Sequence, residues 1–188
     1  MPGLKSITDF KNRLSGGGAR PNLFEVELSN LPEGVEADWP SSDFKFLCKT
    51  AALPASNISA IEVPFRGKTL KVAGDRTFDT WTITIINDEN FAIRKALEKW
   101  MRYMNSHETA RGPSNPSSYY QDATVYQLGR TVKGEDQVLQ AYSFFGIFPT
   151  NISQIDLSYD STDTIEEFSV EFQVQYWKHG DTRSDEDW

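Results

Sequence analysis

The sequence predicts a mainly β fold, a β-sandwich or barrel with one flanking α-helix, and three observations support it. Between positions 23 and 178, apolar residues mostly alternate with polar ones, which is the pattern of half-buried strands. One segment, about 89–104, has the spacing of an amphipathic helix instead. The 188 residues are 38% hydrophobic and 24% charged, which suits one globular domain with its own core. Layers of strands with a helix packed against them satisfy all three observations.

Period-2 alternation predicts about seven or eight strands. The alternating segments are, in chain order, 22–28, 44–50, 80–86, 123–128, 138–148, 154–160 and 166–177. Cys48 lies on the apolar face of the second segment and is expected to be a small buried hydrophobic residue. Residues 58–72 are also β-rich, but Pro64 has no N–H for a central ladder, so this piece is predicted to be an edge strand, a bulge or a projecting hairpin. Residues 29–43 and 105–122 are rich in turn formers and are predicted to be loops.

The helical segment separates apolar from charged side chains. Its apolar stripe consists of Ile93, Leu97, Trp100, Met101 and Met104. Such a stripe predicts packing against the sheet rather than a cofactor site. Asn87 or Asp88 is expected to cap the N-terminus, with acidic residues in the first turn, where the helix dipole favours them. This is the only long helix that the sequence predicts.

The flanking segments predict one domain with an arm and a tail. Residues 1–22 are expected to be a flexible N-terminal arm, 23–178 the β-sandwich domain and 179–188 a polar C-terminal tail. Gly16, Gly17 and Gly18 supply a flexible joint. The arm either forms a short amphipathic helix that docks on a neighbour or is disordered. The apolar residues at helical spacing in it are Leu4, Ile7, Phe10 and Leu14.

Simple counts disfavour two further classes, proteins inserted in a membrane and proteins held together by disulfides. No apolar run approaches the ~20 residues of a membrane helix, and the N-terminus lacks a signal peptide's hydrophobic segment, so no membrane insertion is expected. Cys48 is the single cysteine, which rules out an intramolecular disulfide framework and fits a reducing compartment.

The stretch "VAGDRTFDTWTITIINDEN", residues 72–90, raises the question of a reactive Arg/Asp site. Gly74 is expected to take a positive φ in a tight turn, and Arg76 to pair with Asp75 or Asp79. No base, nucleophile or metal ligand is in place to complete a reactive site. The stretch is therefore predicted to be a stapled turn, followed by a core strand and the cap of the helix.

Catalytic, cofactor and metal sites are not predicted, and the chain is not expected to be an enzyme. The two histidines, His107 and His179, are expected in exposed loops, and one cysteine with two separated histidines has no zinc-ligand spacing. The triple glycine precedes no Gly-Lys-Ser/Thr, so a phosphate loop is excluded. Glu167 and Glu171 share one face of a strand, which is typical of a solvated face rather than a catalytic acid pair.

Charge is distributed unevenly. Residues 135–188 carry 12 Asp or Glu against Lys178 and Arg183, a net charge of −10, in a chain whose net charge is −8. A negative chain is a poor nucleic-acid binder, because that affinity comes mainly from Lys and Arg at phosphates. The asymmetry allows the acidic part of one copy to face another copy, and a solvated acidic surface with a tail is an equal alternative.

Four motifs in order make the chain resemble the tail tube proteins of contractile-tailed, T-even-type bacteriophages. They are "ARPNLF" (19–24), "ALPA" (52–55), "VAGDRTFD" (72–79) with Trp81 and "NDE" (87–89), and "PTN" (149–151). The resemblance implies six subunits in a ring whose inner sheets join into one continuous β-barrel. It further implies that the rings stack into a hollow tube inside the sheath, and that the tube conducts DNA during ejection without binding it specifically. The implied partners are other copies of the chain and the tail sheath, baseplate, tail terminator and tape-measure proteins. The implied location is the virion, after assembly in the host bacterial cytoplasm, and no cofactor is implied.

The same resemblance assigns candidate contact residues. A projecting loop is expected to bury Leu53, Pro54, Ile58, Ile61, Pro64 and Phe65 against a neighbouring subunit. The charged residues expected to help subunit fit are Asp75, Arg76 and Asp79. A hairpin around 139–160 would add two barrel strands, with Gln154, Asp156 and Ser158 facing the lumen; they face solvent or another subunit in the alternative.

Two other functions remain open at this stage. The tube protein of a phage-derived contractile injection or type VI secretion system would share the ring architecture. A monomeric ligand-binding β-sandwich would also fit the strand pattern and the 13% of aromatic residues. The loops at 29–43 and 105–122 look long for the phage family and are expected to be either contacts or decoration.

Overall fold

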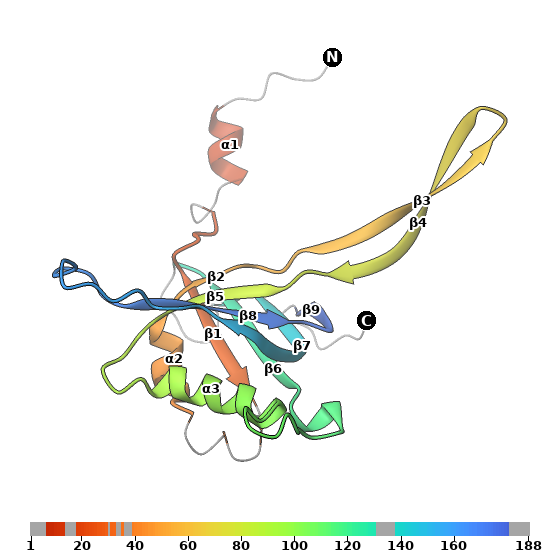
Figure 1. Ribbon diagram of the computed structural model, residues 1–188. Helices are drawn as coiled ribbons and strands as arrows, with labels where there is room; N and C mark the ends of the chain where they lie inside the picture. Colours follow the sequence, from red (N-terminus) through yellow and green to blue (C-terminus); the bar gives the residue numbers. More distant parts are fainter. Residues whose placement is uncertain are drawn as a thin grey trace.

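The structure is a computed structural model that describes residues 7–13, 18–29, 31–32, 35, 39–130 and 138–180 (Figure 1). Three α-helices lie in these ranges: α1 (Ile7–Arg13), α2 (Ser41–Leu47) and α3 (Ala92–Met104), with one 3₁₀ turn, η3 (Pro116–Ser118). The strands are β1 (Phe24–Ser29), β2 (Cys48–Ala51), β3 (Ser56–Phe65), β4 (Lys68–Phe78), β5 (Trp81–Ile86), β6 (Gln121–Leu128), β7 (Val138–Ile152), β8 (Glu167–Gln173) and β9 (Tyr176–Gly180). The mainly β fold with one long flanking helix is confirmed.

Seven strands form one antiparallel sheet in the order β1-β6-β7-β8-β5-β2, with β9 also paired to β7. The long strand β7 belongs to both halves of this sheet. Its residues 141–145 pair with β9, and its residues 148–152 pair with β8. Gly146 lies between the two pairings at φ +62°, a backbone conformation that favours glycine. On this side of β7, the paired strand therefore changes from β9 to β8 at Gly146.

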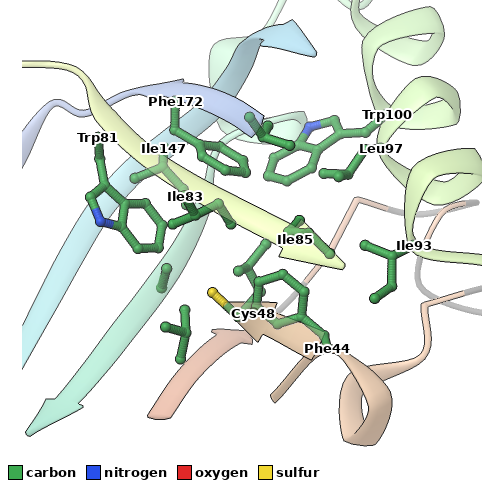
Figure 2. Close-up of a cluster of buried hydrophobic side chains, with 14 of the residues drawn as sticks. Phe44, Cys48, Trp81, Ile83, Ile85, Ile93, Leu97, Trp100, Ile147 and Phe172 are labelled. Carbon is green, nitrogen blue, oxygen red and sulfur yellow. The ribbon is translucent and has the colours of Figure 1, made fainter. Parts of the chain in front are cut away.

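The two halves of the sheet and α3 enclose one core (Figure 2). The Trp81 ring of β5 stacks on the Phe144 ring of β7 with centroids 4.5 Å apart. Trp100 of α3 is fully buried beside Phe172, and its indole N–H donates to the Tyr119 carbonyl at 3.0 Å. Since this bond satisfies the one polar atom of Trp100, the residue joins α3 to the segment before β6 without an unpaired buried group.

The predicted helix is confirmed, with small differences at its start. The core face of α3 holds Ile93, Ala96, Leu97 and Trp100, while Met101 and Met104 are half-buried at its edge. The Asp88 carboxylate accepts from the Ala92 N–H at 3.1 Å, which is the predicted role for Asp88. The expected acidic first turn is wrong, because α3 begins only at Ala92 and its first turn contains no acidic residue.

The predicted strand at 44–50 and loop at 29–43 are wrong where they meet, because residues 41–47 form helix α2. Phe44 is 1% exposed and packs into the core, whereas Phe46, two residues later, is 86% exposed. Lys45 lies between them, and its Nζ is 2.9 Å from Glu25 Oε1 and 3.3 Å from Glu27 Oε1 on β1. The hydrogen bond with Glu25 raises the pKa of Lys45. Three alternating positions are too few to separate a strand from a single helical turn that buries one residue.

The predicted strand at 154–160 is also wrong. Residues 153–158 have no regular secondary structure, while "PTN" continues β7 instead of turning the chain. Of the three alternating apolar residues, Ile155 is half-buried against the core, whereas Leu157 and Tyr159 are exposed, so the described chain does not cover the whole face that the pattern suggested. The hairpin expected around 139–160 is therefore a single strand followed by a loop.

The predicted strand at 166–177 is divided in two. β8 pairs with β5 and β7, and β9 then pairs with the first half of β7. Glu167 on β8 forms an ion pair with Lys49 at 2.6 Å, which fits its structural interpretation. His179 lies in β9 rather than in a loop, which corrects that expectation.

Several predictions about the chain ends lie outside the described residues. They are the apolar positions Leu4 and Leu14, Gly16 and Gly17, the turn at 133–136 and the tail at 181–188. The described part of the arm contains α1, on which Ile7 and Phe10 are exposed. The division into arm, domain and tail stays a prediction.

Candidate assembly surfaces

The most prominent surface is the hairpin of β3 and β4, a two-stranded sheet that projects from the sandwich (Figure 1). A two-residue turn joins its strands, with Arg66 at φ +45° and Gly67 at φ +81°. Positive φ at both positions is the signature of a type I′ turn, whose twist suits a hairpin. An isolated two-stranded hairpin is at best marginally stable in water, so a hairpin of this length indicates a further partner.

The outer part of the hairpin has one apolar and one polar face. Residues paired across an antiparallel ladder point to the same face, and two alternate pairs, which share one face, are Ile61 with Val72 and Val63 with Leu70. The apolar face comprises Ile61, Val63, Phe65, Leu70 and Val72, each between 44% and 66% exposed. The intervening pairs form the polar face, where Lys71 Nζ lies 3.5 Å from Glu62 Oε1. Contiguous exposed apolar surface of this kind is typical of a site that binds another protein or another apolar partner.

The root of the hairpin is held to the sandwich by hydrogen bonds. Trp81 donates from its indole N–H to the Ala52 carbonyl at 3.0 Å, and Trp177 donates to the Ala55 carbonyl at 3.2 Å. The Phe78 ring meets the Trp177 ring edge-on at 6.3 Å. These contacts fix the direction in which the hairpin leaves the sandwich.

Six predicted contact residues lie on the hairpin or at its root. Ile61, Pro64 and Phe65 are in its outer half, Ile58 is in its inner half, and Leu53 and Pro54 precede β3. All but Pro54 are exposed, and Pro54 is half-buried. Among the three forms weighed for residues 58–72, the projecting hairpin is the observed one. That these residues touch a neighbouring subunit stays a prediction.

The stapled turn predicted around Gly74 is wrong. Gly74, Asp75 and Arg76 lie inside β4, at an irregularity in its pairing with β3, and Gly74 does not have a positive φ. A Cβ on Gly74 would come within 2.5 Å of Ser59 Oγ, so glycine allows β3 to approach β4 closely at the irregularity in their pairing. No ion pair in the described chain joins Arg76 to Asp75 or Asp79; instead, Asn57 Nδ2 donates to both Asp79 carboxylate oxygens at 3.0 and 2.9 Å.

Sequence reasoning missed three members of the apolar face. Val63, Leu70 and Val72 alternate with polar residues as regularly as Ile61 and Phe65 do. Alternation on both sides of the Arg-Gly turn could have identified them.

A second surface is the loop between β7 and β8, residues 153–166. Hydrogen bonds hold both of its ends. At the first end, Ser153 Oγ accepts from the Ser169 N–H of β8 at 2.9 Å, and at the second end, Glu166 Oε2 accepts from Asn87 Nδ2 at 2.9 Å. Its middle presents Leu157, Tyr159 and Ile165 to solvent among carboxylates. The predicted lumen residues Gln154, Asp156 and Ser158 all lie in this loop, where Gln154 Nε2 donates to Asp156 Oδ1 at 3.2 Å. Their lumen position stays a prediction, although the strand expected to carry them is absent.

A third surface is a groove of ≈ 290 Å³ along the solvent side of α3. It is lined by Lys95, Glu98, Lys99, Arg102 and His107. Lys95, Lys99 and Arg102 follow one another at i, i+4 and i+7, so they form one stripe opposite the buried face. Arg94, which does not line the groove, neutralises the charge of Glu98, because Arg94 Nε lies 3.0 Å from Glu98 Oε1. The groove is therefore positively charged.

Metal binding and thiol chemistry can each be checked in the described residues. They contain no group of three or more His, Cys, Asp or Glu side chains placed to hold a metal ion. Burial raises the pKa of the Cys48 thiol to about 12, which keeps it protonated and unreactive near neutral pH. None of the helices described is both long and apolar enough to cross a membrane.

A β-sandwich with a packed core and an uncovered apolar hairpin is typical of a structural protein whose subunits bind other proteins. Comparison with known proteins narrows this class. The family model described as phage tail tube protein matches residues 19–180. The tail tube protein gp19 of Enterobacteria phage T4 is 36% identical over 164 residues, which cover 87% of this chain and 93% of that protein. The tail tube protein of Serratia phage KSP90 is 27% identical over 172 residues, covering 90% and 94%. This chain belongs to the phage tail tube protein family.

The fold agrees with this assignment. A chain of an extracellular contractile injection system, described as the PVC sheath/tube terminator in the extended state, matches with a TM-score of 0.61. The match covers 87% of this chain and 97% of that one at 12% identity. An identity this low shows a shared fold, not a shared role.

Proposed function

We propose that this chain is the structural subunit of the inner tube of a contractile phage tail. Six copies form a ring, the rings stack into a hollow tube, and DNA passes through the tube during ejection. Membership of the tail tube family over residues 19–180 carries the proposal. The exposed apolar hairpin supports it, because a monomer would gain nothing from that surface.

The hairpin is the element through which one copy would bind another. Its two strands have unpaired outer edges as well as an apolar face, and both would be covered by a neighbouring copy. Joining strands across subunits would produce the continuous inner barrel that removes these edges. Leu53, Pro54 and Ile58 would extend the contact toward the root of the hairpin. The charged residues Asp75, Arg76 and Asp79 would contribute geometry and specificity rather than much net affinity.

Passage of DNA requires a wall that does not hold phosphates. A net charge of −8 per subunit supports this, since binding to DNA comes largely from basic residues. Gln154, Asp156 and Ser158 are the proposed lumen residues. The Ser158→Cys variant tests them: in assembled tubes the new thiol would react with a small thiol reagent but not with one too large to enter the bore.

Other tail components would contact the same subunit. The proposed partners are the tail sheath, baseplate, tail terminator and tape-measure proteins, with assembly in the host bacterial cytoplasm and residence in the virion tail. Similar solved structures support contacts of this kind, since they come from the baseplate of the anti-feeding prophage and from a sheath/tube terminator of an extracellular contractile injection system. The role is structural, so no catalytic rate should depend on any residue named here.

Electron microscopy of the purified protein tests the proposal. Six-fold rings or hollow filaments are expected, and a monomer that persists at high concentration would refute it.

Two pairs of substitutions on adjacent rungs of the hairpin sharpen this experiment. Ile61→Thr with Val72→Thr removes one apolar rung and should abolish assembly. Glu62→Thr with Lys71→Thr changes the next rung on the polar face and should leave assembly close to wild type. Equal assembly by both variants would exclude the apolar face as the contact.

A tube of an extracellular contractile injection system is a second candidate, because a structural match comes from such a system. The two differ in whether a DNA-filled capsid is attached. Antibodies against this chain should label tails that carry capsids if the phage proposal is right, and headless particles if the second candidate is right.

A further inference from the structure

We propose that neighbouring copies in the ring are joined by an electrostatic contact, in which the tip of the 153–166 loop of one copy enters the basic groove on α3 of the next. The tip residues are Tyr159, Asp160 and Asp163, and the groove residues are Lys95, Lys99, Arg102 and His107. This inference rests on the proposed ring and names the surfaces that close it.

The groove is built to receive carboxylates. Three cationic side chains line one stripe of a rigid helix, and Arg94 already engages the one carboxylate among them, that of Glu98. Lys95 is held at the N-terminal end of the groove, where its Nζ donates to the Asn90 carbonyl at 2.9 Å. The methylene stems of the lysines add apolar surface between the charges.

The loop offers the complementary charges in a defined shape. Asp160 and Asp163 lie in the tip on either side of Ser161, whose N–H donates to the Ser158 carbonyl at 3.2 Å. Tyr159 is fully exposed beside them. A tyrosine ring can pack on lysine stems or over a guanidinium group, and tyrosine is enriched at interface hot spots. Because the base of the loop is hydrogen-bonded to β8 and to Asn87, less entropy would be lost on docking.

The loop does not reach the groove of its own chain. Its base lies beside the start of α3, where Arg94 Nη1 donates to the Ser153 carbonyl at 3.2 Å. From there the loop extends away from the helix and beyond the rest of the sandwich (Figure 1). The acidic tip and the basic groove are thus different surfaces of one subunit, and a contact between unlike surfaces is head-to-tail, which is the kind that closes a ring.

A charge-exchange experiment on the full chain tests this contact. The groove variant carries Lys99→Glu and Arg102→Glu, and the loop variant carries Asp160→Lys and Asp163→Lys. Each alone places like charges in every contact and should raise the concentration needed for assembly at least about tenfold. An equimolar mixture restores opposite charges at every contact if the two variants alternate, and alternation closes in a ring with an even number of subunits. The mixture should therefore assemble within about threefold of wild type.

Asp156→Lys, in the same loop but nearer its base, is the matched control and should assemble normally. Thermal unfolding of each variant as a monomer shows whether it is folded, and rescue by mixing is open only to folded chains. Normal assembly by the single-sided variants would overturn the inference, as would a mixture that stays unassembled. If the groove variant assembles normally but loses binding to a different acidic protein, the groove serves that protein instead. A wild-type chain that forms no rings would refute the proposed function itself, whereas wild-type rings without rescue would refute only this contact.

Discussion

Strands β5 and β3 have nearly the same alternation of apolar and polar residues, yet they end in opposite environments. Trp81, Ile83 and Ile85 of β5 are buried against α3 and the facing half of the sheet. Ile61 and Val63 of β3 remain exposed. Alternation therefore indicates that one face of a strand is meant to be covered, but it does not say whether the cover comes from the same chain. In this chain the uncovered strand β3 is the one that indicates a contact with another protein.

The largest effect on the free energy of unfolding is expected where the chain covers itself. Phe44→Ala should destabilise the monomer by about 3–5 kcal/mol, because it leaves a cavity in the core. Phe46→Ala, on the same helix but exposed, should change the stability by less than about 0.5 kcal/mol. Chemical denaturation of the two variants measures both values. Similar losses would show that α2 is not packed as described.

A smaller effect on stability is expected where β3 and β4 lie close together in the hairpin. Gly74→Ala introduces a Cβ 2.5 Å from Ser59 Oγ, 3.0 Å from the Ser59 carbonyl oxygen and 3.1 Å from Ile61 Cγ1. Although the serine hydroxyl can rotate away, the other two contacts must open, and local loosening of about 1–3 kcal/mol is expected. Hydrogen exchange of hairpin amides is the readout. Gly180→Ala meets nothing within 4 Å and serves as the control.

Cys48 should make the core sensitive to alkaline pH. Its pKa is raised from 9.0 to about 12 by burial, so only the unfolded chain ionises between these values, and stability falls as pH rises through that window. Raising the pH from 9 to 10 should cost about 1 kcal/mol more in the wild type than in Cys48→Ala. Denaturant titrations of both proteins at the two pH values isolate this term. Identical pH dependence would mean that the thiol is accessible to solvent.

The smallest effect on the monomer is expected on the apolar hairpin face, where assembly should suffer most. Ile61→Thr with Val72→Thr should alter the unfolding free energy by less than about 0.5 kcal/mol, because both side chains are already exposed. A large loss in a monomer that cannot assemble would show that the hairpin is covered by its own chain.

Prediction from sequence succeeded where the pattern was long or supported by a second signal. β1 was predicted by its alternation, and α3 by an apolar stripe from Ile93 to Met104 together with Asp88 as a cap. It failed for short alternations, since Phe44 and Phe46 separate on a helical turn and Leu157 and Tyr159 lie in an exposed loop. Local pattern contains no information on which face finds a partner.

The candidate surfaces show the same limit. Pro64 narrowed residues 58–72 to three forms, and the projecting hairpin was among them. The prediction from the charged motif around Arg76 was wrong, because a Gly-Asp pair suggests a turn, whereas here glycine allows β4 to lie close to β3. The spacing of Lys95, Lys99 and Arg102 indicates one stripe on α3, but His107 joins that stripe only through the path of the chain after the helix. Surfaces assembled from separate segments require the fold first.

Strand β7 gives the subunit a mechanical property. A single covalent backbone from Val138 to Ile152 pairs with β6 and β9 at one end and with β8 at the other. Force applied along it passes through peptide bonds rather than across a boundary between separately formed layers. If a sheath contracts around the proposed tube, the two halves of the sheet would deform together instead of sliding. The subunit should behave as a stiff element while its surroundings rearrange.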